Sequence, residues 1–134
     1  MTLSSLSVFG QEKNAETGNP RSHEKIRAAH AAYITERLEL TPAEAEKFWP
    51  VYREYGEKRR ALRQQLRDAR RSGTEEKALL ELDLKLKQQE VDLEKQVSRQ
   101  LEEIISPEKI LALHQAEADF RKLLLRQIQE RRRR

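Results

Sequence analysis

The segment between Gly73 and Pro107 most constrains the fold, because it contains neither glycine nor proline and keeps one apolar period throughout. Its apolar residues recur every three or four positions, the spacing that places side chains on one face of an α-helix. Leu80 to Leu86 also alternate as in a strand, but the length of the pattern favours a helix. The segment therefore predicts one long helix whose main seam comprises Leu79, Leu82, Leu86, Leu93, Val97, Leu101 and Ile104.

The same predicted helix has a second apolar strip on another face, formed by Leu80, Leu84, Val91 and Ile105. One strip can pack against the chain's own preceding helix, and the other then needs a partner. Aromatic residues make up only 5% of the chain, so few large rings are present to build a thick core. We therefore expect an elongated helical body that forms an antiparallel dimer through its second and third helices.

The second helix begins at the clearest local signal in the sequence. Thr41 suits the N-cap, Pro42 the first helical position, and Glu44 can close a capping box. Pro50 lies inside the following apolar stripe, which predicts a kink near Trp49–Pro50 because the stripe resumes in register. The helix should end at Ser72–Gly73, and its stripe, interrupted only by Arg59, comprises Ala45, Phe48, Tyr52, Tyr55, Leu62, Leu66 and Ala69.

Two further helices complete the predicted fold. Ser22 can cap a first helix that ends near Leu40, and Ser106–Pro107 repeats the hydroxyl–proline start about 65 residues after Thr41. The fold class is therefore all-α with four helices, in a single domain over residues 22–130 followed by a basic tail at 131–134.

The N-terminal region differs from the rest in composition. Residues 1–10 are apolar and rich in serine, and residues 11–21 have no apolar period and predict a flexible leader. Residues 1–10 resemble the last part of an export signal that lacks its basic start, which suggests that Met1 lies inside a longer signal and that the protein is periplasmic. The alternative is a disordered N-terminus of a cytosolic protein.

Charge is segregated along the chain, although the formal net charge is only +4. Positions 52–71 hold eight basic and three acidic residues, a balance of +5, and positions 75–105 hold five basic and nine acidic residues, a balance of −4. Positions 107–134 hold eight basic and four acidic residues, a balance of +4. Opposite signs on successive long helices favour their antiparallel pairing, by roughly a few tenths of a kcal/mol per exposed ion pair.

The surplus of basic residues on the second and fourth predicted helices is the candidate binding surface. A basic face attracts acidic or unfolded chains rapidly, and guanidinium planes pack on aromatic and apolar groups. The alternative is a solvated face that keeps an elongated protein in solution. Nucleic acid is disfavoured as a partner because the third helix is acidic and no nucleic-acid-binding motif is present. The candidate residues are Arg59, Arg60, Arg63, Arg67, Arg70, Arg71, Arg121, Lys122 and Arg126.

Four aromatic side chains lie within two turns of the second predicted helix. We expect Phe48, Tyr52 and Tyr55 in the core, because they follow the apolar stripe. Trp49 lies toward the edge of that stripe, where it can be partly exposed as a contact for a client or a second copy.

The sequence favours neither a metal centre nor an active site. His23 and His30 are seven positions apart, too far to share an ion without help, and His114 has no partner at ligand spacing. Solvated or edge histidines are therefore favoured over metal ligands. The chain has no cysteine, no Gly-rich phosphate loop and no Ser or Thr beside a plausible base, so we expect a non-enzymatic protein without a cofactor.

The two capped helix starts resemble the LTxxQ-type motifs of the Spy/CpxP family, in which each motif begins a helix and two long helices lie between them. The first motif is Leu40-Thr41-Pro42-Ala43-Glu44 and the second is Ile105-Ser106-Pro107-Glu108-Lys109. Glu44 and Lys109 occupy positions where the family usually has Gln, and Lys109 cannot accept the hydrogen bond of a capping box. The segment from Phe48 to Tyr52 is also similar to Bacteroidetes-type sensors of extracytoplasmic-function sigma factors.

This resemblance implies a function as well as a fold. It implies a thin, cradle-shaped, antiparallel dimer in the periplasm whose concave face holds unfolded or aggregation-prone proteins without ATP during envelope stress. Relatives instead sense envelope stress or heavy metals by binding a membrane signalling protein. The alternative function is therefore a sensor or regulator that docks on one membrane signalling, anti-sigma or sigma-factor partner, with or without a metal.

Overall fold

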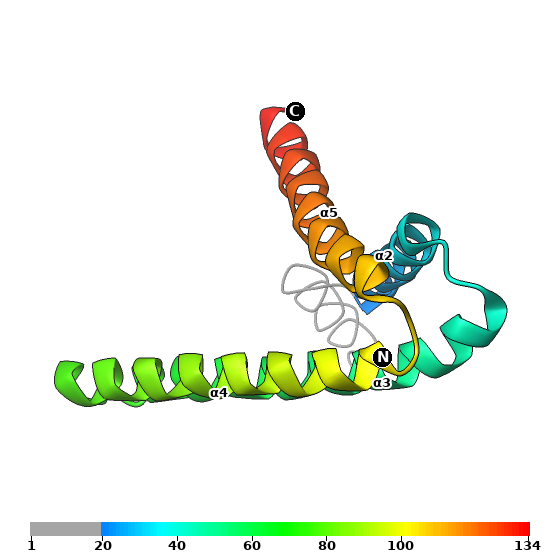
Figure 1. The fold of residues 1–134 in the computed structure, drawn as a ribbon. Coiled ribbons are helices and arrows are strands. Elements are labelled where there is room, and N and C mark those ends of the chain that lie inside the picture. The colour runs from blue at the N-terminus through cyan, green and yellow to red at the C-terminus, as the bar shows by residue number, and fades with distance from the viewer. Residues whose placement is uncertain (1–19) are drawn as a thin grey trace, which may run out of the picture. The chain divides into compact units, whose positions relative to one another are not determined.

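The computed structural model describes residues 20–134, which form four helices and no strand. The helices are α2 (Pro20–Leu38), α3 (Pro42–Arg71), α4 (Glu76–Glu102) and α5 (Pro107–Arg133), as Figure 1 shows. The all-α, four-helix prediction is therefore confirmed. The predicted export remnant at 1–10 and most of the predicted leader at 11–21 lie outside the described residues.

Helix α2 begins two residues before the predicted cap at Ser22, with Pro20 at its start. Proline suits the first helical position because its missing N–H needs no partner there. The helix ends at Leu38, and Glu39 follows with a positive φ of 50°. A residue in the left-handed conformation often follows the end of a helix and turns the chain away from the helix axis, as Glu39 does here.

Helix α3 begins with the predicted capping box. The Glu44 N–H donates to Thr41 Oγ1 at 3.1 Å, and the Thr41 N–H donates to Glu44 Oε1 at 3.0 Å. Pro50 lies inside the helix, which continues to Arg71 as predicted. Figure 1 shows α3 changing direction in its first turns, the part that contains Pro50, before it runs straight alongside α4.

The link between α3 and α4 is a short turn at the predicted position. Ser72 caps the end of α3 with its N–H bonded to Asp68 O at 3.0 Å, and Gly73 has a φ of 75°, a value that favours glycine. Glu75 is the N-cap of α4, and its side chain makes no capping hydrogen bond. Helices α3 and α4 thus form an antiparallel hairpin.

The seam of this hairpin follows the predicted residues. Phe48, Leu86, Val97 and Leu101 are buried, and the remaining seam positions of both helices are half-buried. A hairpin of two helices has one layer of contact, so most seam side chains keep an exposed edge. The exposed strip of α4 also matches the prediction at Leu80, Leu84 and Val91, whereas Ile105 lies beyond the helix and is buried.

The chain divides into two compact units. The hairpin unit, Leu38–His114, contains α3, α4 and the first turns of α5. The α2–α5 unit consists of residues 20–37 of α2 and residues 115–134, most of which belong to α5. The prediction of one helical domain over 22–130 stays a prediction.

Two of the helix starts have hydroxyl caps that can be tested against one that has none. Thr41→Ala and Ser106→Ala should each lower the free energy of unfolding by about 1 kcal/mol, because each leaves helix-start N–H groups without an acceptor. Urea denaturation followed by circular dichroism measures this loss. Glu75→Ala serves as the control, since Glu75 occupies an N-cap position without a capping bond. An equal loss in all three variants would contradict the role of the caps.

Candidate protein-binding surface

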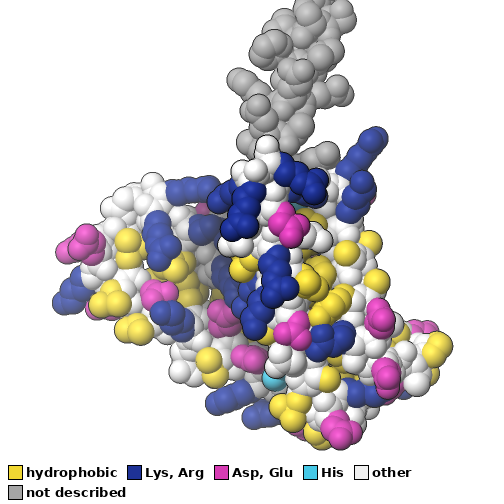
Figure 2. Space-filling model, turned by 90° about the horizontal axis from the view of Figure 1, so that it is seen from above, with side chains coloured by type: hydrophobic (Ala, Val, Ile, Leu, Met, Phe, Trp, Pro, Cys, Tyr) yellow, Lys and Arg dark blue, Asp and Glu magenta, His cyan; other side chains and the backbone are white. Residues whose placement is uncertain are grey.

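The basic candidates on α3 follow helix spacing. Arg60, Arg63, Arg67 and Arg71 recur at intervals of three and four residues, so they share one face of the helix. All four are exposed, as is the nearby Arg70. Figure 2 shows dark blue basic side chains spread among magenta acidic and yellow hydrophobic ones over the face in view. The name α3 arginine row is used below for Arg60, Arg63, Arg67, Arg70 and Arg71.

Members of the α3 arginine row differ in their partners. Arg63 donates to Glu90 Oε1 on α4 at 3.1 Å, and Arg67 donates to Gln64 Oε1 on its own helix at 2.7 Å. Within the described part of the chain, Arg60, Arg70 and Arg71 form no ion pair. The Arg63–Glu90 bond is the one ion pair that joins α3 to α4 among residues 20–134. Opposite charges on the two helices thus produce little direct pairing, and most of the row is free for an external partner.

Arg59 has a different environment from the other candidates. It is half-buried in the apolar stripe, its guanidinium carbon lies 5.4 Å from the centre of the Tyr55 ring, and its Nε atom is buried without a hydrogen-bond partner. A guanidinium can stack on an aromatic face in this way while its outer nitrogens remain wet. Arg59 therefore packs along the seam, and the exposed row is made by its neighbours.

The aromatic residues of α3 form a continuous cluster. The rings of Phe48 and Tyr52 are stacked with centroids 5.1 Å apart, and Trp49 meets Phe48 edge-on at 5.0 Å. Phe48 is fully buried, whereas Trp49 and Tyr55 are half-buried. Phe48 is therefore in the core as predicted, whereas Tyr52 and Tyr55 are only half-buried, like Trp49.

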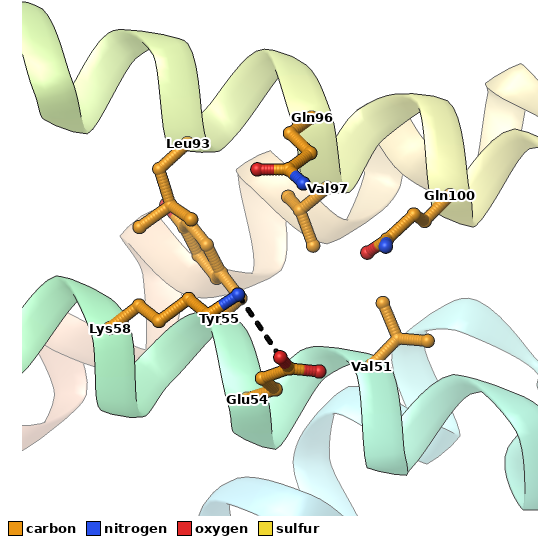
Figure 3. A pocket seen from close by; sticks show the side chains of 8 residues that line it. All are labelled: Val51, Glu54, Tyr55, Lys58, Leu93, Gln96, Val97 and Gln100. Atoms are coloured by element: carbon orange, nitrogen blue, oxygen red, sulfur yellow. Dashed lines mark ion pairs between the residues drawn. The ribbon is translucent and has the colours of Figure 1, made fainter.

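Two openings lie between α3 and α4 on the side of Lys58. The first is a slot with room of about 10 Å³, the size of one water molecule, and Figure 3 shows Lys58 and Glu54 paired at 3.0 Å at its edge. The second is an open groove of about 500 Å³ whose lining includes Leu62 and Leu93 with Gln89 and Gln96 beside them. The groove combines apolar side chains with amides that can both donate and accept hydrogen bonds.

The basic candidates on α5 belong to the other unit. Arg121, Lys122 and Arg126 are all exposed, and none of them forms an ion pair within residues 20–134. Apolar side chains lie between them along the helix, and Leu123 and Leu125 are 42% and 54% exposed. This surface therefore differs in chemistry from the α3 arginine row, because no large apolar side chain of α3 is similarly exposed.

The two family-type motifs meet in the hairpin unit, which the sequence did not indicate. Lys109 Nζ lies 2.8 Å from Glu44 Oε1 and 3.0 Å from the carbonyl oxygen of Glu39. The Lys109 N–H donates to Ser106 Oγ at 3.2 Å, so the second cap is present. Glu44 and Lys109, which hold the same position in the two capped helix starts, are thus paired with each other. We call this contact the cap-to-cap bridge.

The cap-to-cap bridge affects the acidity of its carboxyl group. The hydrogen bond from Lys109, followed by the one from the Thr41 backbone, lowers the pKa of Glu44 below its usual value. A carboxyl group with a lowered folded-state pKa contributes stability above its unfolded pKa, and this contribution is lost as the pH falls through the folded pKa.

The histidines occupy separate places. His30 Nε2 lies 2.7 Å from Glu117 Oε1 and its ring meets Phe120 edge-on at 5.1 Å, all within the α2–α5 unit. His23 is exposed on α2, and His114 lies 4.0 Å from Glu94 in the hairpin unit. No three His, Asp or Glu side chains of the described chain lie close enough together to hold a metal ion.

The α2–α5 unit has a second charged contact that sequence analysis missed. Arg37 donates to Asp119 Oδ2 at 3.0 Å, and the rings of Tyr33 and Phe120 lie 5.4 Å apart. The hydrogen bond from Arg37, with one from Gln115, lowers the pKa of Asp119. The partners of these contacts lie more than 80 positions apart in sequence, so no local spacing signals them.

The cap-to-cap bridge predicts a pH-dependent loss of stability. Lys109→Met should lower the free energy of unfolding at neutral pH. The difference from the parent protein should narrow as the pH falls through the lowered folded-state pKa of Glu44, below which this carboxyl group is protonated in both proteins. Urea titrations over this pH range measure the difference.

The matched control is Lys58→Met, which removes an exposed pair on one helix. It should change the stability little at any pH. A pH-independent loss in Lys109→Met would show that the bond from Lys109 to the Glu39 carbonyl oxygen, and not the charge of Glu44, is responsible.

Comparisons with known proteins provide no further identification. No protein-family model, no curated protein and no solved structure matches this chain. No helix within residues 20–134 has the length and apolar character needed to cross a bilayer. The interpretation of the surface therefore depends on the chemistry of its own residues.

Proposed function

We propose that this protein is a Spy/CpxP-like, non-enzymatic chaperone that binds unfolded or aggregation-prone proteins without ATP in the periplasm. The observation that carries the proposal is the α3 arginine row: a line of exposed guanidinium groups on a long helix, most of them without an ion-pair partner. Unfolded chains that expose acidic and aromatic groups can meet such a row without fitting a defined pocket.

Two other features support binding of adaptable partners. The open groove between α3 and α4 offers Leu62 and Leu93 with glutamine amides beside them, a mixture that suits apolar side chains and free backbone groups. The groove is wide and shallow, unlike the closed concave sites that hold small molecules. Attraction by arginine followed by loose apolar contact is the mechanism that we propose.

Dimerisation is part of the proposal. The strip of Leu80, Leu84 and Val91 is 60%, 58% and 45% exposed on α4. An antiparallel copy placed on this strip would cover it and extend the surface available to a client. The implied cradle with a concave client-binding face belongs to the same proposal.

An aggregation assay with reduced α-lactalbumin as the model client tests the function. We expect suppression at near-stoichiometric ratios and client association that slows steeply as salt is added. The variant Arg60→Gln/Arg67→Gln/Arg71→Gln should slow association at low salt by about tenfold or more, because steering by charge is lost.

The matched control is Arg60→Lys/Arg67→Lys/Arg71→Lys, which keeps the charge and removes the guanidinium planes. It should retain the fast association and release the client sooner. Lack of suppression at every ratio would reject the chaperone and favour the alternative, a sensor or regulator that docks on one membrane signalling or sigma-factor partner.

Sedimentation velocity tests the dimer separately. Leu80→Ser/Leu84→Ser should shift the protein toward monomer at micromolar concentration while leaving its helix content unchanged, because both side chains are exposed within one copy. A parent protein that is already monomeric under these conditions would remove the dimer from the proposal.

A further inference from the structure

The second half of α5 combines positive charge and exposed apolar side chains in a way that no other helix of residues 20–134 does. From Arg121 to Arg134 the chain has seven basic residues and one acidic residue, Glu130, a balance of +6. Leu123, Leu125 and Ile128 are 42%, 54% and 48% exposed in the same segment. Figure 2, viewed onto the end of α5, shows dark blue and yellow side chains beside each other there.

The positions of these residues place basic side chains directly beside the exposed apolar ones around the helix. At 100° per residue, Leu124 and Ile128 lie on one face, and Leu125 lies about 60° beyond Ile128 with Arg121 between them. Leu123 lies on the other side of Leu124, about 100° away. Lys122 and Arg126 lie on the opposite face, four residues apart. All of these side chains except the half-buried Leu124 are exposed.

We propose that this part of α5 docks on the surface of a bilayer that contains anionic lipids. The apolar residues would enter the boundary between headgroups and acyl chains, while the lysine and arginine side chains would contact lipid phosphates. The proposal concerns a helix that lies on the membrane, and it does not depend on the chaperone function proposed above.

Charge decides between a membrane and a second copy as the occupant of this surface. A copy of the same segment would bring a second balance of +6 against the first, so the apolar contact would be opposed by repulsion. An anionic bilayer instead supplies the opposite charge and an apolar layer together. A nucleic acid supplies only the charge and leaves the exposed leucines without a role.

Vesicle co-sedimentation of the full chain tests the proposal. The protein should bind vesicles made of equal parts phosphatidylglycerol and phosphatidylcholine, bind pure phosphatidylcholine far less, and dissociate as salt rises. The variant Arg121→Gln/Lys122→Gln/Arg126→Gln should weaken binding to the anionic vesicles roughly a hundredfold, at about fivefold per residue. Leu125→Ser/Ile128→Ser should weaken binding by about tenfold or more.

Matched variants in the hairpin unit serve as controls. Arg60→Gln/Arg67→Gln/Arg71→Gln removes the same charge from α3, and Leu80→Ser/Leu84→Ser removes two exposed leucines from α4, so both should keep most of the vesicle binding. If the α3 and α5 charge variants lost vesicle binding equally, net charge alone would explain the binding. The proposal would then be overturned. Equal binding to neutral vesicles would overturn it as well.

Two further outcomes for Leu125→Ser/Ile128→Ser would overturn the proposal. If Leu125→Ser/Ile128→Ser converts a dimer to a monomer without lipid, the surface is a contact between copies and the membrane proposal fails. If that variant retains full vesicle binding, the apolar residues have no role and the proposal also fails. The α3 charge variant should lose client association while retaining vesicle binding, which separates the failure of one proposal from that of the other.

Discussion

The apolar seam between α3 and α4 is the interaction on which the rest of the hairpin depends. Each helix contributes one row of side chains, and only Phe48, Leu86, Val97 and Leu101 of these rows are buried. Because the seam is one layer thick, every other face of both helices remains at the surface. The charge pattern of those faces can therefore vary without affecting the core, which explains how α3 can be strongly basic while α4 is acidic.

Local physical signals were sufficient for most of the fold. The capping box at Thr41 and Glu44, the glycine at position 73 and the three-to-four period of the seam act over a few residues, and each produced the expected feature. The start of α2 was less well defined, because both Pro20 and Ser22 suit a helix start and helix ends depend on weak competing preferences. Exposure of Leu80 and Leu84 also followed from spacing alone, since a hairpin covers only one face of α4.

The contacts between distant segments could not be obtained in this way. Glu44 and Lys109 each looked like an imperfect copy of a motif, and their pairing at 2.8 Å depends on how the two helix starts meet in space. The same holds for His30 with Glu117, which are 87 positions apart. A single sequence records the residue types at such positions but not their proximity, so complementary departures from a motif are visible only after the chain is folded.

The basic residues of the chain form two surfaces with different physical properties. On α3, Arg63 and Arg67 are held by Glu90 and Gln64, and no large apolar side chain is exposed beside them. Such a surface attracts acidic groups over long distances but provides little apolar area for them to bind. It therefore suits transient contact with a mobile chain. On α5, basic residues that form no ion pair within residues 20–134 lie beside exposed leucines, so attraction can be followed by burial of apolar area. Equal numbers of arginines on the two helices would therefore have unequal effects, since the neighbours of a charge determine whether an encounter becomes a lasting contact.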